Sequence, residues 1–473
     1  MPAIPLGRSA YARAGAPPTV LKNYYFETAP TNLEDQVALR ARPRLKAFAQ
    51  AGEGPIRGLY REGGVMAGRI LCLSGTTLYR IEQAGVPGVG TATTIGTVNG
   101  TGHMSAEGSV NFAVLACGQT AYQTNGISIS AITPPDGVWF NAVDTLDKRF
   151  LFAVQASNRF YWSDPVHPEA SEMGEIDGLS FAAAESQPDV LITLKVIDDV
   201  LWLVGRLSLE AWRGTGDQDL PYERIEGRVF GIGCTARETA VKMNVDGLDT
   251  MCWVGTDRKV YRLDPNPVRI SDFGLEERLG RSTPETLYGH HAVWNGHDFY
   301  VLHVPGEGTF AYDLTTRAGW AEWTSFQREL LRTRESTIGP NAQSLIGDAL
   351  SGAVFELSEA STLDHGEPVV FEASGQLEVT GAPTRCLNAL LSVTTGAAAN
   401  HTEDPMMQLS LSDDHGATWT ALPDQPLGRT AQRTLRVMWT RLGRLRRETG
   451  RLFRWRTTAP VTINKAKYNE GYR

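Results

Sequence analysis

The sequence predicts an all-β protein, with an irregular β-propeller-like core of about six to seven blades and a C-terminal β-sandwich-like domain. Three observations lead to this prediction. Short apolar strands bounded by turns recur at regular intervals, and few stretches have helical periodicity. The 48 glycines and 25 prolines also provide many tight turns, which suits a chain of short strands better than a helical one.

One hairpin shape recurs along the chain, and its copies begin near Gly68, Asn111, Arg149, Asp198, Asp249, His297 and Ala342. The spacing of roughly 40 to 50 residues is the period of a four-stranded propeller blade. The first strand of each hairpin is apolar on both faces, which is typical of a strand buried between neighbouring blades. A pair of β-sandwiches is the alternative, because it would also show regularly spaced strands.

We expect three parts in the chain of 473 residues: an extended N-terminal arm (1–50), the propeller-like core (51–360) and a C-terminal β domain with an Arg-rich ending (361–473). The hairpin period is lost after about Ser358. Beyond it, strands are predicted at residues 369–379, 387–395, 406–412, 434–442 and 452–463.

Side chains alternate in the last predicted strands. Leu435, Val437 and Trp439 share one face while Arg436 takes the other, and Phe453 and Trp455 oppose Arg454 and Arg456 in the same way. The apolar side chains are therefore expected to face a core, and the arginines to face outward.

The N-terminal arm is Pro-rich and carries one aromatic cluster, Tyr24, Tyr25 and Phe26. Two roles are open for this arm. It can lie across a neighbouring subunit and bury the three rings there. Alternatively, it can supply the first strand that closes this chain's own propeller.

Charge is distributed unevenly. The net charge is −8, but residues 429–473 hold thirteen Arg or Lys against Glu448 and Glu470, a balance of +11. Residues 1–428 therefore keep 32 basic and 51 acidic side chains, a balance of −19. Such asymmetry often marks an interaction surface.

The five cysteines lie far apart without a C-x-x-C pair, which argues against a zinc site or a disulfide framework and favours reduced thiols in a cytosolic folding environment. The N-terminus has no apolar core of signal-peptide type, and no apolar run reaches the roughly 18 residues that span a bilayer. We expect a soluble chain that is not exported by the usual route.

The octet SDDHGATW, residues 412–419, resembles the Asp-box of sialidases and other propeller glycosidases. It occurs once, outside the predicted propeller hairpins, and no arginine cluster, Tyr-Glu pair or acid Asp accompanies it. We therefore predict a structural hairpin turn built by Ser412, Asp414, Gly416 and Trp419. Asp414 accepts backbone N–H bonds, Gly416 takes a positive φ, and Trp419 packs beneath the turn.

Other motifs give weaker signals. The histidines of HHAVWNGHDFYVLH, which are His290, His291, His297 and His303, lack a metal-ligand motif and are expected to be satisfied or surface histidines. The Gly-rich residues 85–102 lack the features of a phosphate-binding loop. The sequence thus predicts no catalytic residue, no metal and no cofactor, and the protein is not expected to be an enzyme.

Four stretches, residues 24–45, 183–212, 409–419 and 436–463, follow one another in an order found in a viral family. Their most specific pieces are Glu-Ser-Gln-Pro-Asp, starting at Glu185, and the Trp-x-Arg-x-Gly-Arg-x-Arg-Arg run of residues 439–447. The chain resembles the packaged-DNA stabilisation proteins, or tail nozzle proteins, of short-tailed bacteriophages.

This resemblance implies a structural virion protein located in the tail and synthesised in the host cytoplasm. Family members assemble as a homo-hexameric ring beneath the head-to-tail adaptor, close the head after packaging and extend the channel for DNA ejection. The implied partners are the adaptor, a tail needle or plug, tailspikes or fibres, and passing double-stranded DNA without sequence specificity. No small-molecule substrate is implied. The alternative is an Asp-box propeller glycosidase or glycan-binding module.

Two hypotheses follow for the charged regions. A body of net charge −19 would repel phosphates if part of that charge lines the DNA lumen. The Arg-rich ending either pairs with the next subunit or adaptor or contacts DNA phosphate, and the alternation with leucine favours a strand fixed at an interface. The candidate assembly interface thus comprises Tyr24, Tyr25, Phe26, Arg441, Arg444, Arg446 and Arg447.

Overall fold

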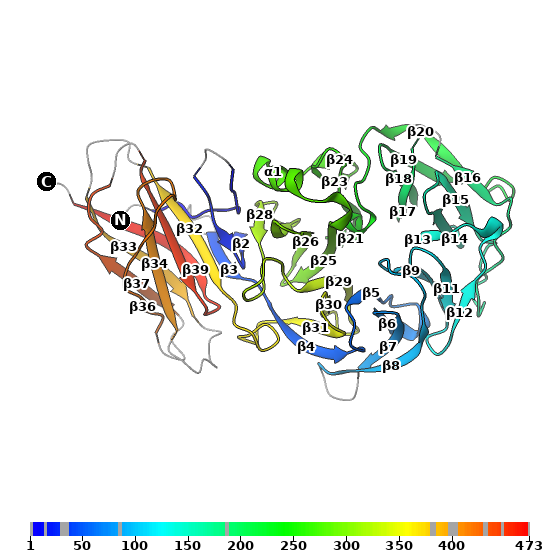
Figure 1. The fold of residues 1–473 in the computed structure, drawn as a ribbon, viewed down its shortest axis with the longest axis horizontal. Coiled ribbons are helices and arrows are strands. Elements are labelled where there is room, and N and C mark those ends of the chain that lie inside the picture. The colour runs from blue at the N-terminus through cyan, green and yellow to red at the C-terminus, as the bar shows by residue number, and fades with distance from the viewer. Residues whose placement is uncertain are drawn as a thin grey trace.

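The computed structural model describes residues 3–13, 17–28, 37–83, 88–184, 189–378, 385–395, 405–428, 434–445 and 449–471. Two bodies lie side by side, a β-propeller at the right of Figure 1 and a β-sandwich at the left. Among the described residues, α1 (Phe273–Arg281) is the single α-helix, and the Asp272 carboxylate caps it by accepting the N–H of Leu275 at 2.8 Å. No described helix combines the length and apolar character needed to cross a membrane.

The propeller has seven four-stranded blades. The first blade contains β5 (Ile56–Tyr60), β6 (Ile70–Ser74), β7 (Thr77–Gln83) and β8 (Gly90–Thr97). The second contains β9 (Ser105–Gly108), β10 (Ala113–Ala116), β11 (Ala121–Thr124) and β12 (Ile129–Ile132). The third contains β13 (Phe140–Leu146), β14 (Arg149–Val154), β15 (Arg159–Trp162) and β16 (Phe181–Ala183).

The next three blades follow in chain order. The fourth blade contains β17 (Leu191–Ile197), β18 (Val200–Gly205), β19 (Leu209–Gly214) and β20 (Tyr222–Phe230). The fifth contains β21 (Val241–Val245), β22 (Leu248–Val254), β23 (Val260–Asp264) and β24 (Asn266–Arg269). The sixth contains β25 (Tyr288–Trp294), β26 (His297–Val304), β27 (Gly308–Asp313) and β28 (Trp320–Glu322).

The seven predicted hairpins are the two middle strands of the seven blades, from β6 and β7 in the first to β30 (Ser344–Asp348) and β31 (Ala353–Ser358) in the last. The first of the two middle strands in each blade is largely buried on both faces, because each blade packs against its two neighbours, and all eight residues of β26 are buried. Aromatic pairs such as Phe140 and Phe152, with ring centroids 4.6 Å apart, fill the space between blades. The propeller prediction is confirmed, and the alternative of two sandwiches is not.

The last blade is closed by the N-terminal part of the chain. Its strands are β29 (Thr333–Ile338), β30, β31 and the outer β4 (Arg44–Gln50), which pairs antiparallel with β31 from Ala353↔Gln50 to Ser358↔Arg44. Hydrogen bonding the first strand to the last covers two sheet edges that would otherwise be exposed. The chain therefore does supply its own closing strand, at residues 44–50.

The sandwich contains two sheets. One sheet has the order β2 (Tyr24–Thr28), β3 (Val37–Ala41), β39 (Thr462–Gly471), β33 (Arg385–Thr394) and β37 (Thr434–Thr440). The facing sheet contains β1 (Leu21–Lys22), β32 (Phe371–Leu377), β38 (Arg451–Thr457), β34 (Met406–Ser412), β35 (Thr420–Ala421) and β36 (Gln425–Pro426). The strands before β4 thus belong to the sandwich sheets, and the Ala10 N–H bonds the Trp320 carbonyl of the sixth blade at 2.6 Å, whereas a separate extended arm was expected over residues 1–50.

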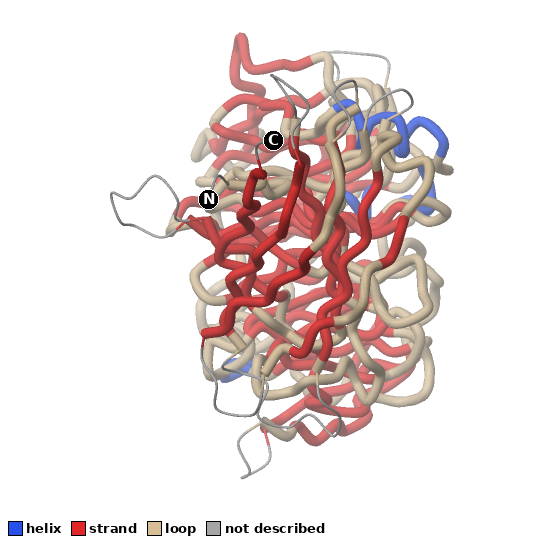
Figure 2. Tube along the Cα trace, turned by 90° about the vertical axis from the view of Figure 1, so that its left-hand side faces the viewer, coloured by secondary structure: helices blue, strands red, loops and turns tan. Residues whose placement is uncertain are grey.

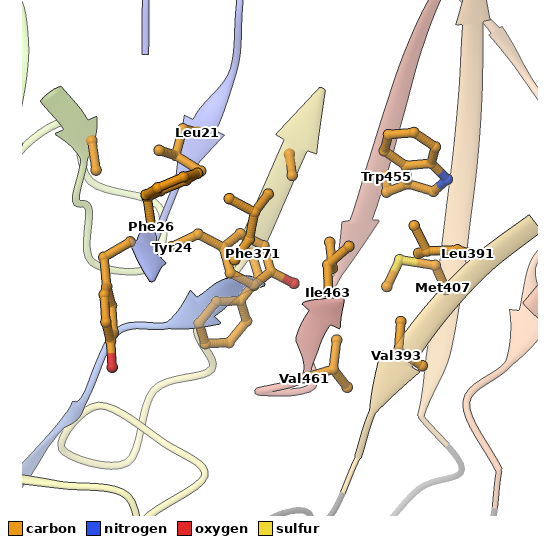
Figure 3. Close-up of a cluster of buried hydrophobic side chains, with 14 of the residues drawn as sticks. Leu21, Tyr24, Phe26, Phe371, Leu391, Val393, Met407, Trp455, Val461 and Ile463 are labelled. Carbon is orange, nitrogen blue, oxygen red and sulfur yellow. The ribbon is translucent and has the colours of Figure 1, made fainter. Parts of the chain in front are cut away.

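The predicted alternation in the sandwich strands matches the burial. Val437 and Trp439 are each 3% exposed while Arg436 is exposed, and Phe453 and Trp455 are fully buried while Arg456 is exposed. Figure 3 shows Trp455, Leu391, Met407 and Ile463 pointing into the space between the two sheets. The two inner faces therefore form one apolar core.

The short strand β1 joins the propeller to the sandwich. It pairs parallel with β28 of the sixth blade and antiparallel with β32, so one ten-stranded sheet runs from β25 to β35. An ion pair of 2.9 Å between Lys22 and Glu322 accompanies the register Lys22↔Glu322. A continuous hydrogen-bonded sheet therefore joins the two bodies.

A buried ion pair fixes the point where the chain passes from the sandwich to the propeller. Arg42 follows β3, and its Nη2 lies 2.5 Å from the Asp364 carboxylate, with side chains 2% and 0% exposed. The same guanidinium donates to Asn23 Oδ1 at 2.8 Å and to the Thr324 carbonyl at 2.9 Å. Asp364 also accepts the N–H of Leu45, in β4, at 2.9 Å. Both charges are thus satisfied by partners from several elements.

Arg42→Ala is expected to lower the free energy of unfolding by about 3–5 kcal/mol, because it leaves the Asp364 carboxylate buried without its counter-charge. Urea unfolding followed by tryptophan fluorescence measures this loss. The matched control is Arg213→Ala, which removes a 2.6 Å pair with Glu223 whose side chains are 63% and 51% exposed. An exposed pair contributes about 0–1 kcal/mol. Equal losses of unfolding free energy in the two variants would contradict a special role for the buried pair of Arg42 and Asp364.

Candidate assembly surface and propeller axis

The Asp-box residues form the turn between β34 and β35. Ser412 Oγ donates to Asp414 Oδ1 at 2.7 Å and accepts the N–H of Gly416 at 2.8 Å. Asp414 accepts the N–H of Thr418 at 2.9 Å and its hydroxyl at 2.5 Å. Gly416 has a φ of 91°, and Trp419 Nε1 donates to its carbonyl at 3.0 Å. Each residue of the motif is thus engaged in closing the turn.

The electrostatics of Asp414 suit this structural role. Hydrogen bonds from the Thr418 hydroxyl and N–H, and then from Ser412, lower the pKa of Asp414 to about 2. A general acid needs a pKa near the working pH. The carboxylate is therefore fixed as an acceptor within the turn.

Asp413 ties the same turn to the Arg-rich segment. Its carboxylate pairs with buried Arg451 through two contacts, Nε to Oδ1 at 2.6 Å and Nη2 to Oδ2 at 2.8 Å. Arg451 also donates to the carbonyls of Leu442 at 2.5 Å and Arg444 at 3.0 Å. One bidentate pair thus fixes two neighbouring surface segments. The sequence pattern did not reveal this role, because Arg451 lies within a strand rich in arginine.

The Arg-rich segment has a defined backbone over residues 441–445. The Arg441 N–H bonds the Leu387 carbonyl at 2.8 Å, and the Cys386 N–H bonds the Gly443 carbonyl at 2.9 Å. Leu442 and Leu445 are buried, while Arg441 and Arg444 are exposed. The structure thus presents two arginines outward from an ordered segment. Arg446 and Arg447, also named as interface candidates, lie outside the described residues.

Tyr24, Tyr25 and Phe26 occupy β2, where they are 0%, 2% and 6% exposed within the chain itself. The Tyr24 ring lies 5.4 Å from Phe371 of the sandwich, and the Tyr25 ring lies 5.4 Å from Phe299 of the sixth blade. Figure 3 shows Tyr24 beside Phe371. This placement differs from the expected contact with a neighbouring subunit, because the chain's own two bodies already cover the rings.

The four histidines of residues 290–303 have different partners, and the rings of His290 and His303 stack with their centroids 5.2 Å apart. His291 contacts Asp298 at 2.8 Å, and His297 contacts Asp313 at 2.7 Å. Burial, and then the nearby His291, lower the pKa of His290 to about 3, so this ring is neutral. Within the described ranges, no group of three or more His, Cys, Asp or Glu side chains has an arrangement that could hold a metal ion. None of the five cysteines, all in described segments, forms a disulfide.

Charged side chains line the propeller axis. His103, which precedes β9, contacts Glu335 of β29 across the axis, and Arg237 donates to the His103 carbonyl at 2.9 Å. The inner strands of four successive blades also carry charges: Glu107, Asp144, Lys195 and Lys242. A cavity of about 260 Å³ remains among these inner strands. Sequence reasoning missed this cluster, and the available signal was a charge inside a short apolar strand, as in FNAVDTL.

Burial and neighbouring charges together set the pKa values in this axial cluster. Burial, and then the Asp144 carboxylate, raise the pKa of Glu107 to about 8. Although burial opposes it, the carboxylates of Asp144 and Glu107 raise the pKa of Lys242. The axis is therefore lined by interacting charges that neighbouring blades hold in place.

Asp414→Asn is expected to destabilise the protein most at neutral pH. The folded-state pKa of about 2 lies below the ordinary value of about 3.9, so the stabilisation by Asp414 is complete above about pH 4 and is lost as the pH falls toward 2. Thermal unfolding of wild type and variant between pH 7 and 3 tests this. The gap between the two midpoints should narrow as the pH falls. A gap independent of pH would exclude the assigned hydrogen bonds.

The chain matches two family models. Residues 17–362 match the model described as bacteriophage P22 Gp10, beta-propeller, and residues 378–469 match the model described as bacteriophage P22 Gp10, beta-sandwich. A search of curated proteins gave no match.

Among solved structures, the WD40 β-propeller domain of Doa1 is similar at 10% identity, over 67% of this chain and 96% of that chain, with a TM-score of 0.42. The extracellular domain of the hybrid two component system BT4673 from B. thetaiotaomicron is similar at 7% identity, over 80% of this chain and 44% of that chain, with a TM-score of 0.40. Both scores are low, so the fold assignment rests on the sheet order and on the family models. Those models cover both bodies, and the chain therefore belongs to the bacteriophage P22 Gp10 family, the packaged-DNA stabilisation or tail nozzle proteins of phages.

Proposed function

We propose that the protein is a structural component of the phage tail that forms a hexameric nozzle ring below the head-to-tail adaptor. The ring closes the head after DNA packaging and extends the channel through which DNA is ejected. The observation that carries this proposal is the family match over both the propeller and the sandwich. The adaptor binds above the ring, and a tail needle or plug and the tailspikes or fibres bind to it as further partners.

The architecture supports a static role. The ten-stranded sheet and the buried pair of Arg42 and Asp364 join propeller and sandwich into one body. A part that transmits load between the head and the remaining tail benefits from such a junction. The exposed arginines of the ordered segment 441–445 provide a fixed surface for a neighbouring protein.

We infer that the DNA path lies outside the propeller, because charged side chains from several blades occupy the propeller axis. The axial cavity of about 260 Å³ is smaller than an ordinary ligand pocket of about 300–1,000 Å³. The major groove of a DNA duplex alone is about 12 Å wide, so a duplex does not fit among these side chains. The lumen for DNA is therefore enclosed between subunits of the ring. No small-molecule substrate is needed for this role, and Asp414, the Asp-box carboxylate, is committed to its turn.

Negative-stain microscopy of the purified protein mixed with adaptor-bearing phage particles tests the proposal. We expect a six-fold assembly that caps the particles. The matched control is the same preparation without particles. Absence of a six-fold assembly, together with hydrolysis of a chromogenic glycoside, would instead support the glycosidase alternative.

The assembled ring is expected to bind linear duplex DNA weakly. A body with a balance of −19 that lines part of the lumen repels phosphate, and the basic C-terminal residues are occupied by protein. Filter binding of labelled duplex to capped particles, measured across salt concentrations, checks this. Tight binding that weakens steeply with salt would indicate a basic lumen and would contradict the proposal that acidic side chains line part of the lumen.

A further inference from the structure

The connection between β15 and β16, residues 163–180, is an ordered insertion at the outer side of the third blade. Corresponding outer connections are shorter, with β23 and β24 separated by one residue and β11 and β12 by residues 125–128. Buried Val166 and half-buried Met173 and Ile176 pack against the core between the second and third blades. The Met173 N–H also donates to Gln123 Oε1 at 3.1 Å. The insertion therefore presents a fixed surface.

This surface is acidic with one exposed apolar side chain. Its exposed carboxylates are Asp164, Glu169, Glu172, Glu175 and Asp177, and residues 164–177 contain no Lys or Arg. Leu179 is 86% exposed at the end of the same insertion. The nearby Arg149 side chain donates a hydrogen bond to the Ser163 carbonyl, at the start of the insertion, at 2.9 Å.

The outer face of β39, β33 and β37 has the opposite charge. Two rows cross these strands, Lys465↔Ser392↔Arg436 and Lys467↔Leu390↔Met438. Met438 is 47% exposed, and the described side chains of these rows include no carboxylate. Burial, and then the adjacent Lys467 ammonium, lower the pKa of Lys465. The positive charges of these two lysines therefore lie close together. We call these two rows the basic face.

The two surfaces lie at opposite ends of the molecule. In Figure 1, β33 and β37 lie at the left end of the longest axis, and β15 and β16 lie at the right end. Figure 2 looks along this axis from the sandwich end and shows strands at the surface nearest the viewer. One rigid copy cannot bring its own two ends together, so the basic face and the insertion can meet only between copies.

We propose that the basic face docks on the β15–β16 insertion of the next copy of this chain. This inference rests on the proposed ring. Carboxylates meet ammonium and guanidinium groups, and Leu179 meets the apolar Met438 and Leu390. A head-to-tail contact between two different patches closes into a ring when its rotation fits, whereas a self-complementary contact gives a dimer.

Two charge-reversal variants test the contact. One is Glu169→Lys, Glu172→Lys and Glu175→Lys, and the other is Arg436→Glu, Lys465→Glu and Lys467→Glu. Like charges placed across a contact cost several kcal/mol, so each triple variant should reduce the fraction of protein in rings on adaptor-bearing particles by about tenfold or more. Mixing the two variants should partly restore assembly where unlike copies alternate around the ring, because each contact between unlike copies joins either two native surfaces or two reversed ones.

That mixture forms repulsive contacts as well, so the decisive rescue is the single chain that carries all six changes. In it every contact is reversed on both sides, and assembly should return toward the wild-type level. The matched control is Asp219→Lys, Glu223→Lys and Glu226→Lys, three exposed carboxylates of the neighbouring blade, which should assemble as wild type. Thermal unfolding confirms that each variant is folded.

Each result has a distinct meaning. Normal rings in both triple variants, or no rescue in the six-change chain, would overturn the docking proposal and leave the ring itself in place. Failure of the wild-type chain to form rings would refute the proposed function and, with it, the docking proposal. An equal loss of rings in the control triple variant would show that net charge, not the position of the changed residues, causes the loss. That result would also overturn the docking proposal.

Discussion

The buried pair of Arg42 and Asp364 is the interaction on which the arrangement of the two bodies depends. It lies where the chain leaves the sandwich after β3 and enters β4, the strand that closes the propeller. The same carboxylate accepts the N–H of Leu45, and the same guanidinium reaches the Thr324 carbonyl beside the sixth blade. The closing strand, the sandwich and the sixth blade are thus held at one point, because a buried charge must keep all of its partners.

This junction has consequences for function. Since the two bodies form one unit, a force on the sandwich is transmitted to the propeller through the sheet from β25 to β35. The propeller axis is occupied by charged side chains from several blades. In the ring that we propose, the lumen lies between copies, and the opposite charges at the two ends of the long axis suit a head-to-tail order.

The sequence predicted the features that depend on local pattern. The seven hairpins, the loss of their period near Ser358 and the outward arginines at 436 and 456 all follow from the two-residue period of a strand. The Asp-box turn could be interpreted in the same way, because its hydrogen bonds lie within eight residues.

Long-range pairings could not be predicted. Hydrophobicity indicated that Tyr24, Tyr25 and Phe26 would be buried, but it could not identify Phe371 and Phe299 as their partners. The strand β1 has two residues and therefore no period of its own. Arg42 and the axial charges have no pattern at all, since their partners lie hundreds of residues away or on other blades.

The most direct measurement is a side-chain-resolution reconstruction of the protein assembled on phage particles that contain DNA. We expect six copies around a central lumen, with DNA density in that lumen and none within the propeller axis, where His103 and Glu335 remain in contact. DNA density through the propeller axis, or a monomeric protein attached at the side of the tail, would contradict this arrangement.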